Sequence, residues 1–234
     1  QQRIREHWWL CVGLLALAPL AAGHLGIQLP GQAQLMPETP MEVSPPVLMF
    51  LAALPWVFAG GLLGPLPAVV TGIAGGLVLS LYETNSPFTP LETGLLALLF
   101  SAAVRQNYRS WMFAVLRHPL AAALVTAAVY LPLLIFTSLL STNAAMAVRL
   151  DYALNQTWQL WAARAGELLV AGLFAEMVYL AGVRQWGRRR MLVPSPAERS
   201  IETRFFYGAV PLVLFRVVAL ITGDWLVAGT AARQ

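Results

Sequence analysis

The chain has 234 residues, of which 58% are hydrophobic and 11% charged, with a formal net charge of +4. Soluble domains usually carry about 25% charged residues, so this composition excludes an ordinary soluble domain and predicts an integral membrane protein. The single cysteine, Cys11, excludes an internal disulfide and a cysteine-based metal cluster.

Several segments are apolar enough to predict transmembrane helices, which need about 20 mainly apolar residues each. In chain order they are residues 8–27, 47–63, 66–82, 91–106, 119–140, 164–183 and 205–224. Unpaired backbone groups are costly in lipid, which favours helices, and the sequence lacks the alternation of barrel strands. The predicted fold is therefore all-α, a polytopic membrane helix bundle of about seven transmembrane helices, or six if 91–106 is re-entrant or interfacial.

The arginines predict the orientation of this bundle, since lysine is absent. With the N-terminus in the cytoplasm, the inner segments hold Arg3, Arg5, Arg105, Arg109, Arg117, Arg184, Arg188, Arg189, Arg190, Arg199 and Arg204, and the outer segments hold Arg149, Arg164 and Arg233. Cytoplasmic loops carry an excess of positive charge. We therefore expect a bacterial inner-membrane protein with an extracytoplasmic C-terminus. A basic cytoplasmic loop at 184–204 supplies the topology anchors Arg184, Arg188, Arg189 and Arg190.

Two pairs of glycines recur at a spacing of four residues, Gly60 with Gly64 and Gly72 with Gly76. Small residues at this spacing allow helices to approach closely. We favour packing within the bundle, and an interface between two copies in a homodimer is the alternative.

Charged residues inside the predicted spans are candidates for a functional site, because a charge at the centre of a bilayer is costly. Arg216 lies within 205–224, and Glu176 and Glu167 lie within 164–183. We expect Arg216 to pair with one of these two glutamates. The pair is either a structural ion pair or part of a polar pocket that binds a small ligand or a proton.

Other chemistries have little support in the sequence. The three histidines are scattered, so no metal site and no cofactor are expected. No serine and histidine pair at membrane depth, so this segment is not expected to be an enzyme. The run "RQWGRRR" at 184–190 favours contact with the anionic lipid of the bilayer over nucleic acid.

The stretch "PSPAERSIETRFFYGAVPLVLFRVVALITGDWLVAGTAARQ" at 194–234 resembles the entry segment of multidomain bacterial sensor proteins. In that family a basic stretch precedes a transmembrane helix that leads to an extracytoplasmic sensing domain. The stretch "GLLGPLPAVVTGIAGGLVLSLYETNSPFTPLETGLLALLFSAAVRQNYR" at 61–109 is similar to the membrane sensory modules of LytS-type kinases. Similar glycine-rich sequences occur in the substrate-binding membrane subunits of energy-coupling-factor vitamin transporters.

These resemblances imply a sensory and anchoring bundle at 1–204, followed at 205–234 by a transmembrane helix. No glycine or proline follows Ala231 to close that helix, so we expect it to continue into an extracytoplasmic domain beyond Gln234. The predicted function is signal transduction, with a conformational signal passing through the last helix toward a histidine kinase or cyclase domain of the same chain. A small-molecule-binding transporter subunit is the alternative, and a scaffold without a ligand is a third option.

Overall fold

The structure is a computed structural model that describes residues 8–24, 26–28, 47–141, 144–182, 186, 192–195, 209, 212, 213 and 216. The chain divides into two compact units. The first contains residues 1–106 and 111–190, and the second contains residues 107–110 and 191–234. Each unit is described by itself. The predicted boundary between residues 204 and 205 lies outside the described residues.

The described chain is mostly helical, as the composition predicts. In chain order the elements are α2 (Trp8–His24), β1 (Gly26–Gln28), β2 (Val47–Met49), α3 (Leu54–Phe58), the π-helical η1 (Ala59–Leu63), α4 (Pro65–Leu79), the π-helical η2 (Ser80–Thr84), α5 (Thr89–Arg105), α6 (Trp111–Leu116), α7 (Pro119–Leu140) and α8 (Met146–Leu180). The two strands form an antiparallel hairpin in which Ile27 faces Leu48.

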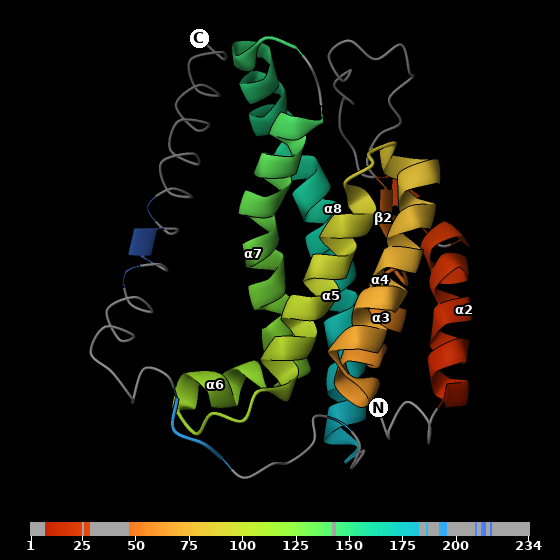
Figure 1. Ribbon diagram of the computed structural model, residues 1–234, viewed down its shortest axis with the longest axis vertical. Helices are drawn as coiled ribbons and strands as arrows, with labels where there is room; N and C mark the ends of the chain where they lie inside the picture. Colours follow the sequence, from red (N-terminus) through yellow and green to blue (C-terminus); the bar gives the residue numbers. More distant parts are fainter. Residues whose placement is uncertain are drawn as a thin grey trace. The chain divides into compact units, whose positions relative to one another are not determined.

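The helices of the first unit run in alternate directions (Figure 1). α2 and α4 run upward in this view, whereas α3, α5 and α8 run downward, and α7 runs upward. α7 packs along α8, α4 along α5, and α2 against α4. The core where these helices meet is apolar, and Val57, Phe100 and Leu168 are among its fully buried side chains.

The four glycines with the spacing of four residues lie where the chain approaches α5. A Cβ atom at Gly72 would lie 2.9 Å from the carbonyl oxygen of Thr93, and one at Gly76 would lie 2.7 Å from the Cα atom of Pro90. Gly60 faces Ser101 in the same way, at 3.2 Å. Gly64 has a φ of 133°, a left-handed conformation that suits the turn between η1 and α4. The homodimer alternative stays a prediction.

Helix boundaries are wrong for three of the predicted spans. The predicted span at 8–27 runs into strand β1, because α2 ends at His24. The predicted span at 47–63 begins as strand β2 and a turn, and its helix starts only at Leu54, where Pro55 occupies the first turn. The predicted span at 164–183 is the second half of α8, which begins at Met146. The segment at 146–163, which we expected in an outer loop, contains no glycine or proline and is rich in residues that favour a helix.

Two helices in the described part of the chain are long and apolar enough to cross a membrane, Pro65–Thr84 and Pro119–Leu140. Trp8–Gly23 and Leu54–Leu63 are shorter apolar helices. Length and composition alone support a membrane location only weakly, so the predicted number of about seven spans is not shown. The predicted span at 205–224 lies outside the described residues apart from 209, 212, 213 and 216.

Candidate functional site: a buried charged cluster

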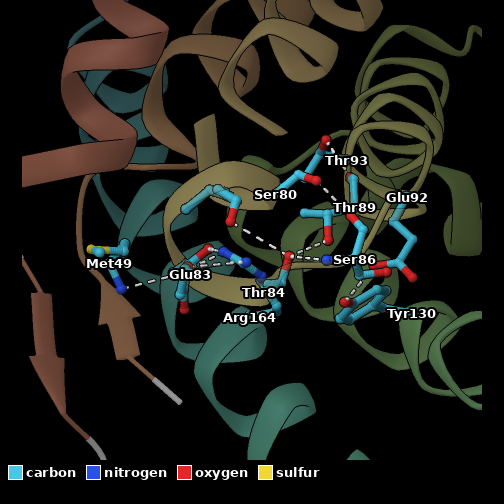
Figure 2. Close-up of polar contacts among 12 residues, drawn as sticks. Met49, Ser80, Glu83, Thr84, Ser86, Thr89, Glu92, Thr93, Tyr130 and Arg164 are labelled. Atoms are coloured by element: carbon cyan, nitrogen blue, oxygen red, sulfur yellow. Dashed lines mark hydrogen bonds and ion pairs between the residues drawn. The ribbon is translucent and has the colours of Figure 1, made fainter. Parts of the chain in front are cut away.

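Arg164 of α8 forms the centre of a buried ion-pair network. Its Nη1 atom lies 2.9 Å from both carboxylate oxygens of Glu167, one turn further along the same helix. Its Nη2 atom lies 3.3 Å from Oε2 of Glu83 at the end of η2. The three side chains are 7%, 4% and 9% exposed, respectively. Arg164 therefore links α8 to the end of the α4–η2 segment (Figure 2).

The turn that carries Glu83 is held by its own hydroxyl groups. Ser80 donates to the carbonyl of Ser86 at 2.6 Å, and the hydroxyls of Thr84 and Thr89 lie 2.6 Å apart. Asn85 ends η2 in the left-handed conformation. These contacts join η2 to the first turn of α5, so the position of Glu83 depends on both elements.

The β1–β2 hairpin contacts the cluster through its backbone. The N–H group of Met49 donates a hydrogen bond of 3.1 Å to Oε1 of Glu167. The neighbouring side chain of Leu48 packs where Gly166 leaves room on α8. Glu167 thus accepts hydrogen bonds from α8 and from strand β2.

Glu92 of α5 is a second buried carboxyl group in this region, and the residue is 5% exposed. The hydroxyl of Tyr130 on α7 lies 3.0 Å from its Oε2 atom, and the hydroxyl of Thr137 contacts its Oε1 atom. We call Arg164, Glu83, Glu167 and Glu92 together the charged cluster.

A cavity of about 10 Å³ adjoins the charged cluster. Arg164 and Glu167 line it on one side, and Trp56, Gly76 and Thr93 are among the residues on the others. This volume is close to the minimum for one water molecule. The cavity therefore has no room for an organic ligand.

The other predicted site residues lie elsewhere. Glu176 accepts a hydrogen bond of 3.1 Å from the N–H group of Leu120 in the first turn of α7, and its Oε1 atom lies 2.9 Å from Nδ1 of His118. Arg216 is exposed and belongs to the second unit. Its pairing with Glu176 or Glu167 stays a prediction. The predicted topology anchors Arg184, Arg188, Arg189 and Arg190 lie outside the described residues.

Sequence reasoning identified Glu167 but missed three members of the cluster. Arg164 was expected in an outer loop, and the spacing of three residues between Arg164 and Glu167 is the one signal that joins them. Glu83 and Glu92 lie at the edges of predicted spans, where charged residues are ordinary. Whether Glu83 and Glu92 come to lie in the same region as Arg164 depends on how η2 and α5 pack.

The chemistry open to the cluster follows from its charges. The guanidinium group of Arg164 pairs with two carboxyl groups, those of Glu83 and Glu167, whereas the carboxyl group of Glu92 meets the hydroxyls of Tyr130 and Thr137. Among the described residues, no group of three histidine, cysteine, aspartate or glutamate side chains could hold a metal ion. The cluster can therefore hold helices together or bind a proton.

No protein-family model, curated protein or solved structure matches this chain.

Proposed function

We propose that the chain is a membrane-embedded sensory and anchoring module of a bacterial signal-transduction protein. The observation that carries the membrane location is an inverted distribution of side chains. Large apolar side chains such as Leu66, Phe136 and Leu173 are exposed on the outside of the bundle, whereas the charged cluster is buried. In water this arrangement is unfavourable, but in a bilayer apolar side chains face lipid and charged side chains face the protein interior.

The dimensions of the helices agree with this location. The continuous helical segment 65–84 has 20 residues and α7 has 22, which at 1.5 Å per residue gives lengths of about 30 and 33 Å. The hydrocarbon core of a bilayer is about 30 Å thick. Neither segment contains a charged residue before Glu83. With the alternating directions in Figure 1, α2, α3–η1, α5 and α8 would cross beside them.

The arginines of the first unit fit the proposed orientation. Arg105 ends α5 and Arg117 precedes α7, so both lie at the end of the bundle where α8 also ends. The opposite end has Arg149 near the start of α8. Arg164 is paired inside the bundle instead of lying in an outer loop. This distribution supports a cytoplasmic location for the end that carries Arg105 and Arg117.

The size of the cavity beside the charged cluster argues against capture of an organic molecule at that place. Sites for small organic molecules have volumes of about 300–1,000 Å³, whereas this cavity has about 10 Å³. In the proposed mechanism, a change in the contacts of Arg164 alters how α8 packs against η2 and the hairpin. The shift passes along α8 to the predicted last helix at 205–224.

Cysteine labelling tests the membrane location. In a Cys11→Ala background, single cysteines replace the exposed residues Pro87 and Ala181 at opposite ends of the bundle. A membrane-impermeant maleimide applied to intact cells is expected to label Pro87→Cys, and to label Ala181→Cys only after permeabilisation. Equal labelling of both in intact cells contradicts the proposed topology.

Spin-label distances test the sensory mechanism in the full chain in nanodiscs. One label replaces Leu180 at the end of α8 and another replaces Val213. The triple variant Arg164→Gln with Glu83→Gln and Glu167→Gln removes the ion pairs without stranding a charge, and it is expected to change the distance distribution. The matched control Glu176→Gln leaves Arg164 paired. An unchanged distribution in the triple variant contradicts signal passage through α8.

A further inference from the structure

Helix α6 (Trp111–Leu116) runs in a different direction from the rest of the first unit. It lies across the lower end of the bundle in Figure 1, whereas α5 and α7, which it connects, run along the bundle. His118 is extended, with a ψ of 126°, as the residue before a proline prefers, and Pro119 begins α7. The proline therefore separates α6 from α7. α6 packs against both α7 and α5.

One side of α6 exposes large apolar side chains. Trp111, Met112 and Val115 are 76%, 57% and 50% exposed, respectively. Their spacing places them on the same side of the helix, whereas Phe113 and Leu116 on the other side are half-buried. Adjoining exposed apolar side chains, unlike isolated ones, mark a surface that binds a partner or a membrane. We call Trp111, Met112 and Val115 the α6 face.

Basic side chains flank the α6 face. Arg105 ends α5 and Arg117 follows α6, and each donates a hydrogen bond to a backbone carbonyl, of 3.2 and 3.4 Å respectively. Carbonyl groups are neutral, so these bonds position the guanidinium groups without neutralising them. Among the described residues, Glu176 is the one carboxyl group at this end of the bundle, and it meets His118. The described residues at this end therefore carry an excess of positive charge.

The depth of α6 indicates what covers its exposed face. α7 has 22 residues, which is about 33 Å at 1.5 Å per residue, so in the proposed membrane location it spans a hydrocarbon core of about 30 Å. Pro119 then lies near the lipid headgroups, and so does α6, which ends three residues earlier. The direction of α6 across the bundle is then parallel to the membrane surface. Tryptophan is enriched at this depth.

We propose that α6 is an interfacial anchor that binds the cytoplasmic leaflet of the membrane. The α6 face enters the boundary between headgroups and acyl chains, and Arg105 and Arg117 attract the phosphate groups of anionic phospholipids. A protein partner would have to displace lipid from this depth, and the flanking charges match phosphate. The inference rests on the proposed membrane location and orientation. It adds that the connection between α5 and α7 binds lipid itself.

The accessibility of a spin label tests this proposal with the full chain in nanodiscs. In a Cys11→Ala background, a labelled cysteine replaces Met112 in the α6 face, or the exposed Ala181 at the same end of the bundle as a control. Oxygen concentrates in lipid, whereas a water-soluble nickel chelate is excluded from it. We expect oxygen to reach the label at 112 more readily than the chelate does, and the reverse at 181.

Two outcomes of this measurement overturn the proposal. If the chelate reaches position 112 more readily than oxygen does, the α6 face lies in water. If neither reagent reaches position 112, protein covers the face, either a second copy or another part of the chain.

Lipid composition tests the role of the flanking charges. Replacing part of the phosphatidylcholine with phosphatidylglycerol should lower the access of the chelate to position 112, and Arg117→Gln should weaken this response. Arg149→Gln at the opposite end is the matched control, because Arg149 also donates from Nε to a backbone carbonyl, at 2.6 Å. It should leave the response unchanged. No response to phosphatidylglycerol, or an equal loss in both variants, overturns the assignment to anionic lipid.

Failure of the anchor is distinguishable from failure of the proposed function. If Pro87→Cys and Ala181→Cys label from opposite sides of the membrane while position 112 faces water, the α6 anchor fails and the proposed topology stands. If lipid covers position 112 while these two cysteines label equally in intact cells, lipid binding by α6 stands and the proposed topology fails.

Discussion

The two ends of the first unit hold acidic side chains in different ways. In the charged cluster, Arg164 and its partners are at least nine-tenths buried, and carboxyl groups outnumber cations. At the opposite end, Glu176 meets His118 and the N–H group of Leu120 at the start of α7, in what we call the α7 clasp. There the side chain of His118 is 49% exposed and that of Glu176 is 17% exposed.

The comparison shows that burial determines how much stability is lost when one partner of an ion pair is removed. Water screens the α7 clasp, and the positive end of the α7 helix dipole assists it, so either partner can be lost at little cost. The charged cluster has neither advantage, so each of its charges depends on the others. We therefore expect substitutions in the cluster to have large and coupled effects, and substitutions in the clasp to have small and independent ones.

Loss of Arg164 should have the largest effect. Arg164→Leu leaves Glu83 and Glu167 buried without a cation, and removal of one partner from a buried pair typically costs about 3–5 kcal/mol. The free energy of unfolding is measured in detergent by chemical denaturation. Arg164→Leu combined with Glu83→Gln and Glu167→Gln should recover a large part of the loss. Equal destabilisation of the single and triple variants contradicts the view that stranded carboxylates cause the damage.

A smaller effect is expected where α4 packs against α5 beside the cavity. A Cβ atom at Gly76 would lie 2.7 Å from the Cα atom of Pro90, so Gly76→Ala forces backbone to move and should cost about 1–3 kcal/mol. The neighbour Gly75 is the matched control, since its Cβ atom would meet Ala18 at an ordinary 3.8 Å. Gly75→Ala should be neutral or stabilising by up to about 1 kcal/mol. Thermal unfolding of both variants checks the difference, and equal melting temperatures contradict the close packing at Gly76.

The helices could be predicted from the sequence because they follow the apolar runs. Residues 119–140 coincide with α7, and 91–106 nearly coincide with α5. The hairpin was missed because β1 and β2 have three residues each and gain their structure from each other. The first half of α8 was missed because hydropathy separates apolar from polar residues, whereas 146–163 is polar and still helical.

The candidate site was predictable only in part, for a related reason. Glu167 is a charge in an apolar segment, and the cost of such a charge in lipid makes it visible in the sequence. Its partners come from the same helix and from η2, which is 81 residues distant from Arg164. Sequence spacing does not reveal that a π-helical turn directs Glu83 toward α8, because tertiary packing decides it.

The α7 clasp should give the smallest effect and so completes the comparison. Glu176→Gln keeps a group that can accept from the N–H of Leu120 but removes the negative charge at the start of α7. Charges near a helix terminus contribute about 0.3–1 kcal/mol when they are partly exposed, and salt screens them. We expect Glu176→Gln to lower the free energy of unfolding by less than about 1 kcal/mol, and the difference from wild type to shrink in high salt. Arg164→Leu should be far less sensitive to salt, because its partners are buried. Destabilisation of Glu176→Gln as large as that of Arg164→Leu, at any salt concentration, would show that the two ends do not differ in the way their burial indicates.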